Sequence, residues 1–110
     1  MSYRHKELAA GRWARLSFAE QMANVGSEIE RAINWKAKNN ADYSRLAAER
    51  AMELLELTIE GGGGYPRLKE LTRAREAVAD YFFGTNEFVS MDELWRQYFS
   101  PFALMASRDK

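Results

Sequence analysis

Apolar side chains recur at intervals of three and four residues in several segments of this chain, and this period limits most strongly what it can fold into. The first such stripe consists of Phe18, Met22, Val25, Ile29 and Ile33. Residues at these intervals share one face of an α-helix, so the stripe predicts an amphipathic helix. Gly26 lies on the same face, where a missing side chain lets a neighbouring helix approach closely.

The ends of this helix are also marked. Ser17 and Glu20 fit a capping box, in which the serine hydroxyl accepts from the Glu20 amide and the glutamate bonds back to the Ser17 amide. The Asn39-Asn40 pair is predicted to end the helix.

A second helix is predicted from Asp42 to Glu60, and it is apolar on two strips. One strip contains Tyr43, Leu46, Ala47, Leu54, Leu57 and Thr58. The other contains Met52, Leu55 and Ile59. Between them runs a charged ridge of Arg45, Glu49, Glu53, Glu56 and Glu60. Two apolar strips are typical of a helix wedged between two neighbours, either within its own bundle or between the bundle and another subunit.

Four consecutive glycines, Gly61–Gly64, follow this helix and raise the question of a phosphate-binding loop. A P-loop follows a strand and ends in Lys-Ser or Lys-Thr, whereas a helical pattern precedes these glycines and neither pair follows them. We therefore interpret Gly61 as a helix C-terminal cap, the next glycines as a link, and Pro66 as the start of the next helix. Phosphate binding at that helix N-terminus is the alternative.

Two further helices complete the pattern. The third is predicted from Pro66 to Phe83, with Gly84 as its stop. The fourth is predicted to open at Ser90 with a second capping box, and Val89 and Leu94 are spaced to form a hydrophobic staple. Its stripe contains Leu94, Tyr98, Phe102 and Met105, and Ser100-Pro101 is predicted to kink or restart it.

These patterns predict an all-α protein, an up-down four-helix bundle formed as a single domain over residues 1–110, with short loops and a glycine-rich link between the second and third helices. The 46% of hydrophobic residues suffice for a compact core, and the lack of cysteine excludes disulfides and thiolate chemistry. No apolar run approaches a membrane span or a signal-peptide core, so we expect a cytoplasmic protein with no membrane contact.

The charges are distributed unevenly along the chain. Residues 1–38 carry seven basic and four acidic side chains, whereas residues 39–66 carry two basic and five acidic ones. This asymmetry suits packing within the domain or between copies.

Two arginines fall where the helical pattern predicts burial. Arg50 lies among apolar residues of the second helix, and Arg75 interrupts the apolar stripe of the third. A buried guanidinium needs carboxylate partners, and the candidates are Glu28, Glu30, Glu76 and Asp80. A structural network is the first interpretation. Exposure of the charged ends, or an anion or nucleotide site built on both arginines, are the alternatives.

Metal and catalytic sites find little support in the pattern. A di-iron bundle needs two Glu-x-x-His pairs, and His5 is the single histidine. We interpret the glutamates of the charged ridge as solvated, with a loosely held divalent ion as the alternative. Ser17 and Ser90 are explained by capping, so we expect no catalytic residue, no metal and no cofactor.

Two tryptophans suggest an interface. Trp35 lies on the helix face opposite the first stripe, together with Arg31, and Trp13 lies in the basic segment GRWAR. Aromatic and arginine side chains dominate interface hot spots, so Trp13, Arg31, Trp35 and the Met52/Leu55/Ile59 strip are the interface candidates. Cover by other parts of the same chain is the alternative. Arg12 and Arg15, with Arg4 and Lys6 and the aromatic residues Tyr3 and Trp13, are the candidates for nucleic-acid contact. A solvated or packed N-terminal segment is the first interpretation of these residues, and nucleic-acid contact is the alternative.

The central pair of helices, RLAAERAMELLELT and RLKELTRAREAVADYF, resembles small prokaryotic four-helix-bundle families. One includes the accessory proteins of diversity-generating retroelements, and that resemblance implies a cyclic oligomer that docks a reverse transcriptase and RNA. The other is the HEPN bundle family, whose nucleases place a histidine several residues after an arginine. His5 follows Arg4 directly, so this resemblance implies a non-catalytic member.

The sequence therefore predicts a non-catalytic interaction module, either a homo-oligomer or a small accessory subunit of a larger complex. A nucleic-acid-binding accessory subunit is the second expectation. An enzyme or anion-binding protein that uses Arg50 and Arg75 is the third.

Overall fold

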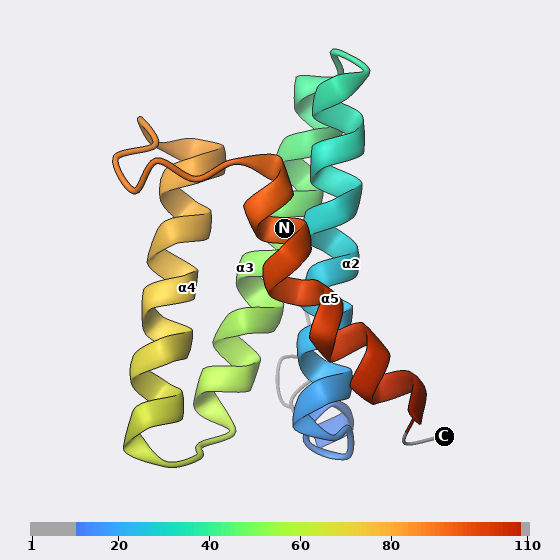
Figure 1. Cartoon of the computed structure of the whole chain (residues 1–110), viewed down its shortest axis with the longest axis vertical. Helices are drawn as coiled ribbons and strands as arrows, with labels where there is room; N and C mark the ends of the chain where they lie inside the picture. Colours follow the sequence, from blue (N-terminus) through green and yellow to red (C-terminus); the bar gives the residue numbers. More distant parts are fainter. Residues whose placement is uncertain (1–10, 109–110) are drawn as a thin grey trace.

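The computed structural model describes residues 11–108, and four main helices form its bundle (Figure 1). They are α2 (Phe18–Ala37), α3 (Ala41–Glu60), α4 (Tyr65–Phe83) and α5 (Asp92–Arg108). Successive helices run in opposite directions, as the predicted up-down order requires. A helical turn at residues 11–14 precedes α2, and no strand occurs between residues 11 and 108.

The first two helices begin and end where the sequence predicts. The Glu20 amide donates to Ser17 Oγ at 3.1 Å, and Glu20 Oε1 accepts from the Ser17 amide at 2.9 Å, which completes the capping box. Asn39 has a positive φ of 62° just after α2, and the Asn40 side chain accepts from the Tyr43 amide at 3.0 Å. Asparagine tolerates this left-handed backbone, so the pair turns the chain into α3.

The glycine run turns the chain between α3 and α4. The Gly61 amide donates to the Leu57 carbonyl at 3.1 Å, as a helix cap does. Gly62 and Gly63 have φ of 90° and 120°, values that residues with a Cβ rarely adopt. Pro66 lies in the first turn of α4, which begins one residue earlier than predicted.

The helices pack in the order α4, α3, α2, α5, with α3 between α2 and α4 and with α5 across α2 (Figure 1). This position explains most of the two apolar strips of α3, but Tyr43 and Leu46 near its start are exposed. Leu55 is fully buried, and Met52 and Ile59 are half-buried against the core. The assignment of this strip to a subunit interface is therefore wrong for Leu55, because the bundle itself covers it.

The close contact predicted at Gly26 joins α2 to α5. A Cβ atom added at Gly26 would lie 2.8 Å from Cβ of Phe99, closer than real Cβ atoms approach one another. Phe99 is buried and stacks with Trp95, with ring centroids 6.2 Å apart. The missing side chain of Gly26 therefore sets how closely α5 approaches α2.

The fourth helix differs from its prediction. It begins at Asp92, and Ser90 belongs to the preceding loop, where its amide and carbonyl both bond the Asn86 side chain. Val89 and Leu94 are both exposed, so the predicted staple does not form. The helix also continues through Pro101 without restarting. Pro101 is exposed, so water can satisfy the carbonyl that the proline leaves without a donor.

Candidate interaction surface

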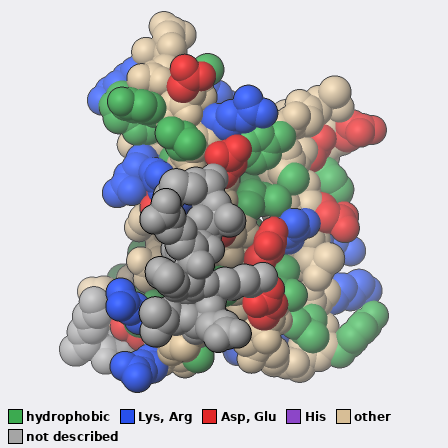
Figure 2. Space-filling model, turned by 180° about the vertical axis from the view of Figure 1, so that it is seen from behind, with side chains coloured by type: hydrophobic (Ala, Val, Ile, Leu, Met, Phe, Trp, Pro, Cys, Tyr) green, Lys and Arg blue, Asp and Glu red, His purple; other side chains and the backbone are tan. Residues whose placement is uncertain are grey.

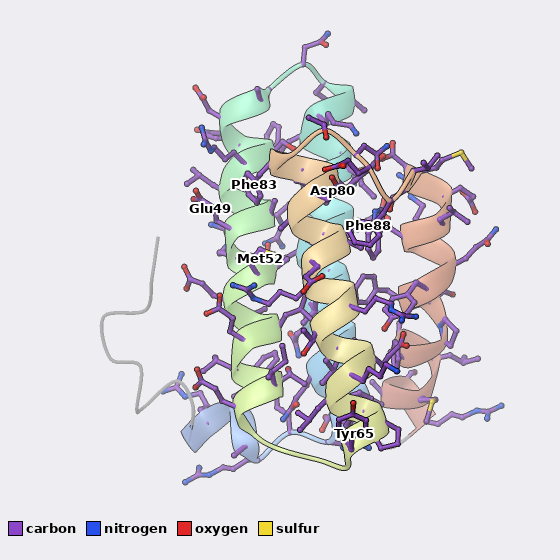
Figure 3. The ribbon with its side chains drawn as sticks, turned by 90° about the vertical axis from the view of Figure 1, so that its left-hand side faces the viewer. Glu49, Met52, Tyr65, Asp80, Phe83 and Phe88 are labelled. Carbon is purple, nitrogen blue, oxygen red and sulfur yellow. The ribbon has the colours of Figure 1, made fainter. Side chains whose placement is uncertain are left out.

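The connection from α4 to α5 is held in one shape by the last turn of α4. Both carboxylate oxygens of Asp80 accept backbone hydrogen bonds, from the Glu87 amide at 2.8 Å and from the Phe88 amide at 3.0 Å. The Asp80 carbonyl accepts from the amides of Gly84 and Asn86. A single residue therefore fixes both the end of α4 and the middle of the loop (Figure 3).

Asn86 closes a second ring of hydrogen bonds in the same connection. Its side chain accepts from the Ser90 amide at 2.8 Å and donates to the Ser90 carbonyl at 3.0 Å. Its carbonyl accepts from the Val89 amide at 3.0 Å. Within this ring Val89 has a φ of 54°, a left-handed conformation that is unfavourable for a β-branched residue. Such strain costs about 1–3 kcal/mol and persists only where the surroundings enforce it.

This fixed connection and the first turn of α5 hold large apolar side chains in solvent. The exposed fractions are 54% for Phe88, 74% for Val89, 56% for Met91 and 46% for Leu94. We call these four residues the apolar loop. Single exposed apolar side chains are ordinary, but four within seven residues concentrate exposed apolar side chains in one short segment, and such concentrations often mark interaction sites.

The sequence around the apolar loop is acidic, although Lys69 and Arg73 of α4 line the same hollow as Phe88. Residues 76–95 contain five acidic side chains and no basic one. Glu76, Glu87 and Glu93 are exposed, whereas Asp80 bonds the loop and Asp92 contacts Lys36, 3.5 Å from its Nζ. The face opposite the view of Figure 1 instead mixes hydrophobic, basic and acidic side chains (Figure 2).

Two tyrosines join α4 to α5, one near each end of α4. Near the apolar loop, the Tyr81 hydroxyl donates to Asp92, and Lys36 Nζ lies 3.3 Å from the same hydroxyl. Near the glycine link, the Tyr98 hydroxyl donates to Glu70 at 3.0 Å. Burial is the main cause that raises the pKa of each phenol, and the carboxylate that it bonds adds to the rise. Both hydroxyls therefore act as hydrogen-bond donors.

A cavity of about 380 Å³ lies beside Tyr81, between the start of α3 and the end of α4. Lys36, Ser44 and Arg45 contribute polar groups to its lining. These groups are already engaged within the bundle. Lys36 contacts Asp92, the Ser44 hydroxyl donates to the Ala32 carbonyl at 2.8 Å, and Arg45 lies 3.9 Å from Glu49.

The two tryptophans predicted to form an interface are both partly covered by the chain itself. Trp35 packs edge-to-face on Tyr43, with ring centroids 4.9 Å apart, and Lys38 Nζ lies 5.3 Å from its ring. Trp13 packs against the core, and its Nε1 donates to Thr58 Oγ1 at 2.9 Å. For Trp13 the structure therefore agrees with the alternative, cover by other parts of the same chain.

The arginines predicted to be buried reach solvent. The Arg50 side chain is 44% exposed and lies 3.4 Å from Glu28, one of its predicted partners, which Arg31 also contacts at 3.2 Å. The Arg75 side chain is 39% exposed and bonds Glu56 at 2.8 Å. Burial is therefore the wrong prediction for both, because long side chains carry their charged ends outward.

The remaining predicted partners also have other roles. Arg75 bonds neither Glu76 nor Asp80, since Glu76 faces solvent and Asp80 holds the loop. Glu30 bonds Arg96, with Nε 2.9 Å from Oε1. Arg50 and Arg75 therefore pair with different helices, Arg50 with α2 and Arg75 with α3.

The predicted nucleic-acid residues are only partly described. Arg12 and Arg15 are exposed, whereas Tyr3, Arg4, His5 and Lys6 lie outside the described residues. Within residues 11–108, no three acidic or histidine side chains come together in a way that could hold a metal ion. In the same part of the chain, none of the helices is both long and apolar enough to span a membrane.

The fold defines a small all-α bundle. No protein-family model, curated protein or solved structure matches this chain. The resemblances to retroelement accessory bundles and to the HEPN family therefore remain predictions from the helix pattern.

Proposed function

We propose that this chain is a non-catalytic interaction module, a small accessory subunit that docks onto another protein through the apolar loop. The observation that carries the proposal is the fixed exposure of Phe88, Val89, Met91 and Leu94. Under the resemblance drawn from the helix pattern, the other protein is a reverse transcriptase.

The energetics of the loop favour binding over a purely structural role. Exposed apolar side chains gain free energy when a partner removes them from water, about 25 cal/mol for each Å² buried. The bonds from Asp80 and Asn86 fix the backbone in advance, so docking loses less conformational entropy than docking through a flexible loop. A merely connecting loop gains nothing from the strained φ of Val89.

The charge of the region also bears on the class of partner. The exposed side chains of Glu87 and Glu93, within and just after the loop, repel the phosphates of a nucleic acid. The nearby basic side chains Lys69 and Arg73 lie on α4, beside Phe88 alone of the four apolar residues. A protein surface with apolar side chains and basic ones at its rim complements the loop.

Site-specific photo-crosslinking in the native host tests the proposal. A photoreactive residue is placed at Val89 and, as a control, at Leu104, which is 60% exposed but lies near the end of α5. We expect a covalent adduct of defined mass from position 89 and none from position 104. An excess of the wild-type chain should compete the adduct away, whereas an excess of Met91→Asp should not.

Two outcomes would contradict the proposal. One is equal crosslinking from positions 89 and 104, which would mean non-specific contact. The other is no adduct from position 89, or an adduct that Met91→Asp competes away as well as the wild-type chain does.

A further inference from the structure

The outward face of α4 is a second surface that the bundle leaves uncovered. This helix packs on α3 through its buried residues Leu71, Ala74 and Val78. The opposite side carries six exposed side chains at helical spacing, and we call them the α4 outer face. They are Tyr65, Lys69, Thr72, Arg73, Glu76 and Phe83. Figure 3 looks onto this face: Tyr65 lies at the start of α4, and Phe83 lies at its other end on the side of α3, where Arg45 is 5.9 Å from its ring.

The two ends of the α4 outer face are aromatic. Tyr65 is 76% exposed and Phe83 is 42% exposed, one at the first and one at the last position of the helix. A hollow of about 400 Å³ lies beside the first half of the face, with Leu68 in its wall and Phe88 at its far side. Large rings at both ends and a hollow between them provide apolar area for a docked helix.

The charges along the α4 outer face follow a simple order. Several charged groups of α4 are engaged elsewhere, because Arg67 stacks on Phe18, Glu70 bonds Tyr98 and Arg75 bonds Glu56. Lys69, Arg73 and Glu76 remain, and none of them forms an ion pair with another described side chain. The face is therefore basic toward its N-terminal end and acidic toward its C-terminal end, where Glu87 of the following loop adds a second exposed carboxylate.

We propose that two copies of this chain associate through the α4 outer face, with the two α4 helices antiparallel about a twofold axis at the level of Ala74. In this arrangement Tyr65 of each copy meets Phe83 of the other, since both lie nine residues from the axis. Lys69 and Arg73 of each copy then approach Glu76 of the other. A twofold axis repeats every such contact, as in most homodimers.

The order of charges identifies a second copy as the occupant. Antiparallel packing of the face on itself brings opposite charges together, whereas parallel packing would bring like charges together. A surface that binds an unrelated protein has no reason to carry charges complementary to those of an antiparallel second copy of itself. This inference does not rest on the proposed docking of the apolar loop, and the two surfaces share only Phe88, which lines the hollow beside α4.

The small size of the proposed contact between the two α4 helices determines the protein concentrations at which the dimer can be measured. A helix of 19 residues is about 28 Å long, so a contact between two such helices lies at the small end of specific interfaces. We expect a dimer that depends on concentration, measurable by sedimentation velocity between about 1 and about 100 µM.

Charge reversal on the full chain tests the proposal. Arg73→Glu places carboxylates opposite Glu76 of the second copy, and Glu76→Arg places guanidinium groups opposite Arg73. We expect each variant to weaken the dimer at least about tenfold. An equimolar mixture of the two variants should form dimers again, because both pairs between positions 73 and 76 are then oppositely charged. The double variant Arg73→Glu/Glu76→Arg should also dimerise.

Several results would overturn the proposal. A wild-type chain that stays monomeric at the highest concentration would do so. Single variants that dimerise as well as the wild type would also do so, because the contact would then lie elsewhere. So would a mixture that stays monomeric. If circular dichroism shows that a reversed variant is unfolded, Arg73→Gln and Glu76→Gln replace it and should each weaken the dimer.

A final control separates this inference from the proposed function. Met91→Asp should leave the dimer intact while it removes the crosslink from position 89. Arg73→Glu should weaken the dimer while that crosslink remains. If Met91→Asp also dissociates the dimer, the dimer contact runs through the apolar loop and the α4 outer face is not the interface.

Discussion

The connection before α4 and the connection after it both contain left-handed backbone, but they place different residues there. The first uses Gly62 and Gly63, for which positive φ is ordinary. The second uses Asn86 and Val89, and only the asparagine tolerates such a conformation well. The glycine link therefore turns the chain without strain. The apolar loop contains a strained valine that hydrogen bonds hold in place, and this difference is one ground for the proposal that the loop binds a partner.

The largest effect is expected when the anchor of the apolar loop is removed. Asp80→Ala deprives two amides of a charged acceptor, so we expect a loss of about 2 kcal/mol in the free energy of unfolding. Urea denaturation followed by tryptophan fluorescence measures it. Glu87→Ala is the matched control, because the Glu87 side chain is exposed, and it should stay within about 0.5 kcal/mol of the wild type. Equal stabilities of the two variants would mean that Asp80 does not anchor the loop.

The second prediction tests whether the glycine link needs glycine. Gly62→Val places a β-branched residue at a φ of 90°, and we expect it to destabilise the fold by about 1–2 kcal/mol in the same measurement. Gly61→Ala is the control, since Gly61 has helical angles and a Cβ there meets only ordinary contacts. This control should be neutral or slightly stabilising. If the Gly62→Val variant is as stable as the wild type, the first connection does not need glycine, and the two connections do not differ in backbone strain as described.

The third prediction relieves the strain in the apolar loop. Val89→Asn replaces a β-branched residue by one that adopts positive φ readily, so we expect about 1 kcal/mol of added stability. The same variant should lose the crosslink that a neighbouring probe at Met91 forms. Leu94→Asn, a similar loss of apolar surface within α5, should not stabilise the fold. A destabilised Val89→Asn variant would show that the Val89 side chain supports the fold.

The smallest effect on stability at neutral pH is expected for the two tyrosines that join α4 to α5, Tyr81 of α4 and Tyr98 of α5. The pKa of Tyr98 is raised above its ordinary value of about 10 by burial and by Glu70, so the folded chain keeps a proton that the unfolded chain has lost. That stabilisation is complete below pH of about 10 and is lost as pH rises through the folded pKa.

Alkaline denaturation of two variants tests this comparison. Tyr98→Phe should reduce the loss of stability above pH of about 10. Tyr81→Phe should reduce it less, because Lys36 opposes the rise of the Tyr81 pKa. At pH 7 we expect either variant to cost less than about 1 kcal/mol. If Tyr98→Phe and the wild type lost the same stability at alkaline pH, the raised pKa of Tyr98 would not be a cause of that loss.

Local patterns predict much of this fold, since the helix period, the Ser17 capping box and the glycine run depend on neighbouring residues only. Burial of a long side chain is harder to predict. The helical period places Arg50 and Arg75 on apolar faces, but their flexible stems let the charged ends reach Glu28 and Glu56 at the surface.

The candidate site was largely missed for a related reason. Val89 and Leu94 have the spacing of a hydrophobic staple. Spacing alone does not reveal that the Asn86 side chain forms hydrogen bonds with the backbone of Ser90, which keeps Ser90 in the loop. The available signal was the run of apolar residues interrupted by Asn86 and Ser90, both of which favour turns. The sequence also does not predict that Asp80 accepts hydrogen bonds from the loop amides. That contact depends on the backbone conformation at the end of α4, which forms only in the folded chain.

The contact between Gly26 and Phe99 bears on how distant relatives of this chain can be recognised. The two residues are far apart in the sequence, yet a larger residue at 26 would clash with Phe99 and a smaller one at 99 would leave a cavity beside Gly26. Over long divergence the two positions should therefore vary together, a larger residue at 26 with a smaller one at 99. Such paired variation can outlast ordinary sequence identity, and it would identify a related bundle where the helix pattern alone cannot.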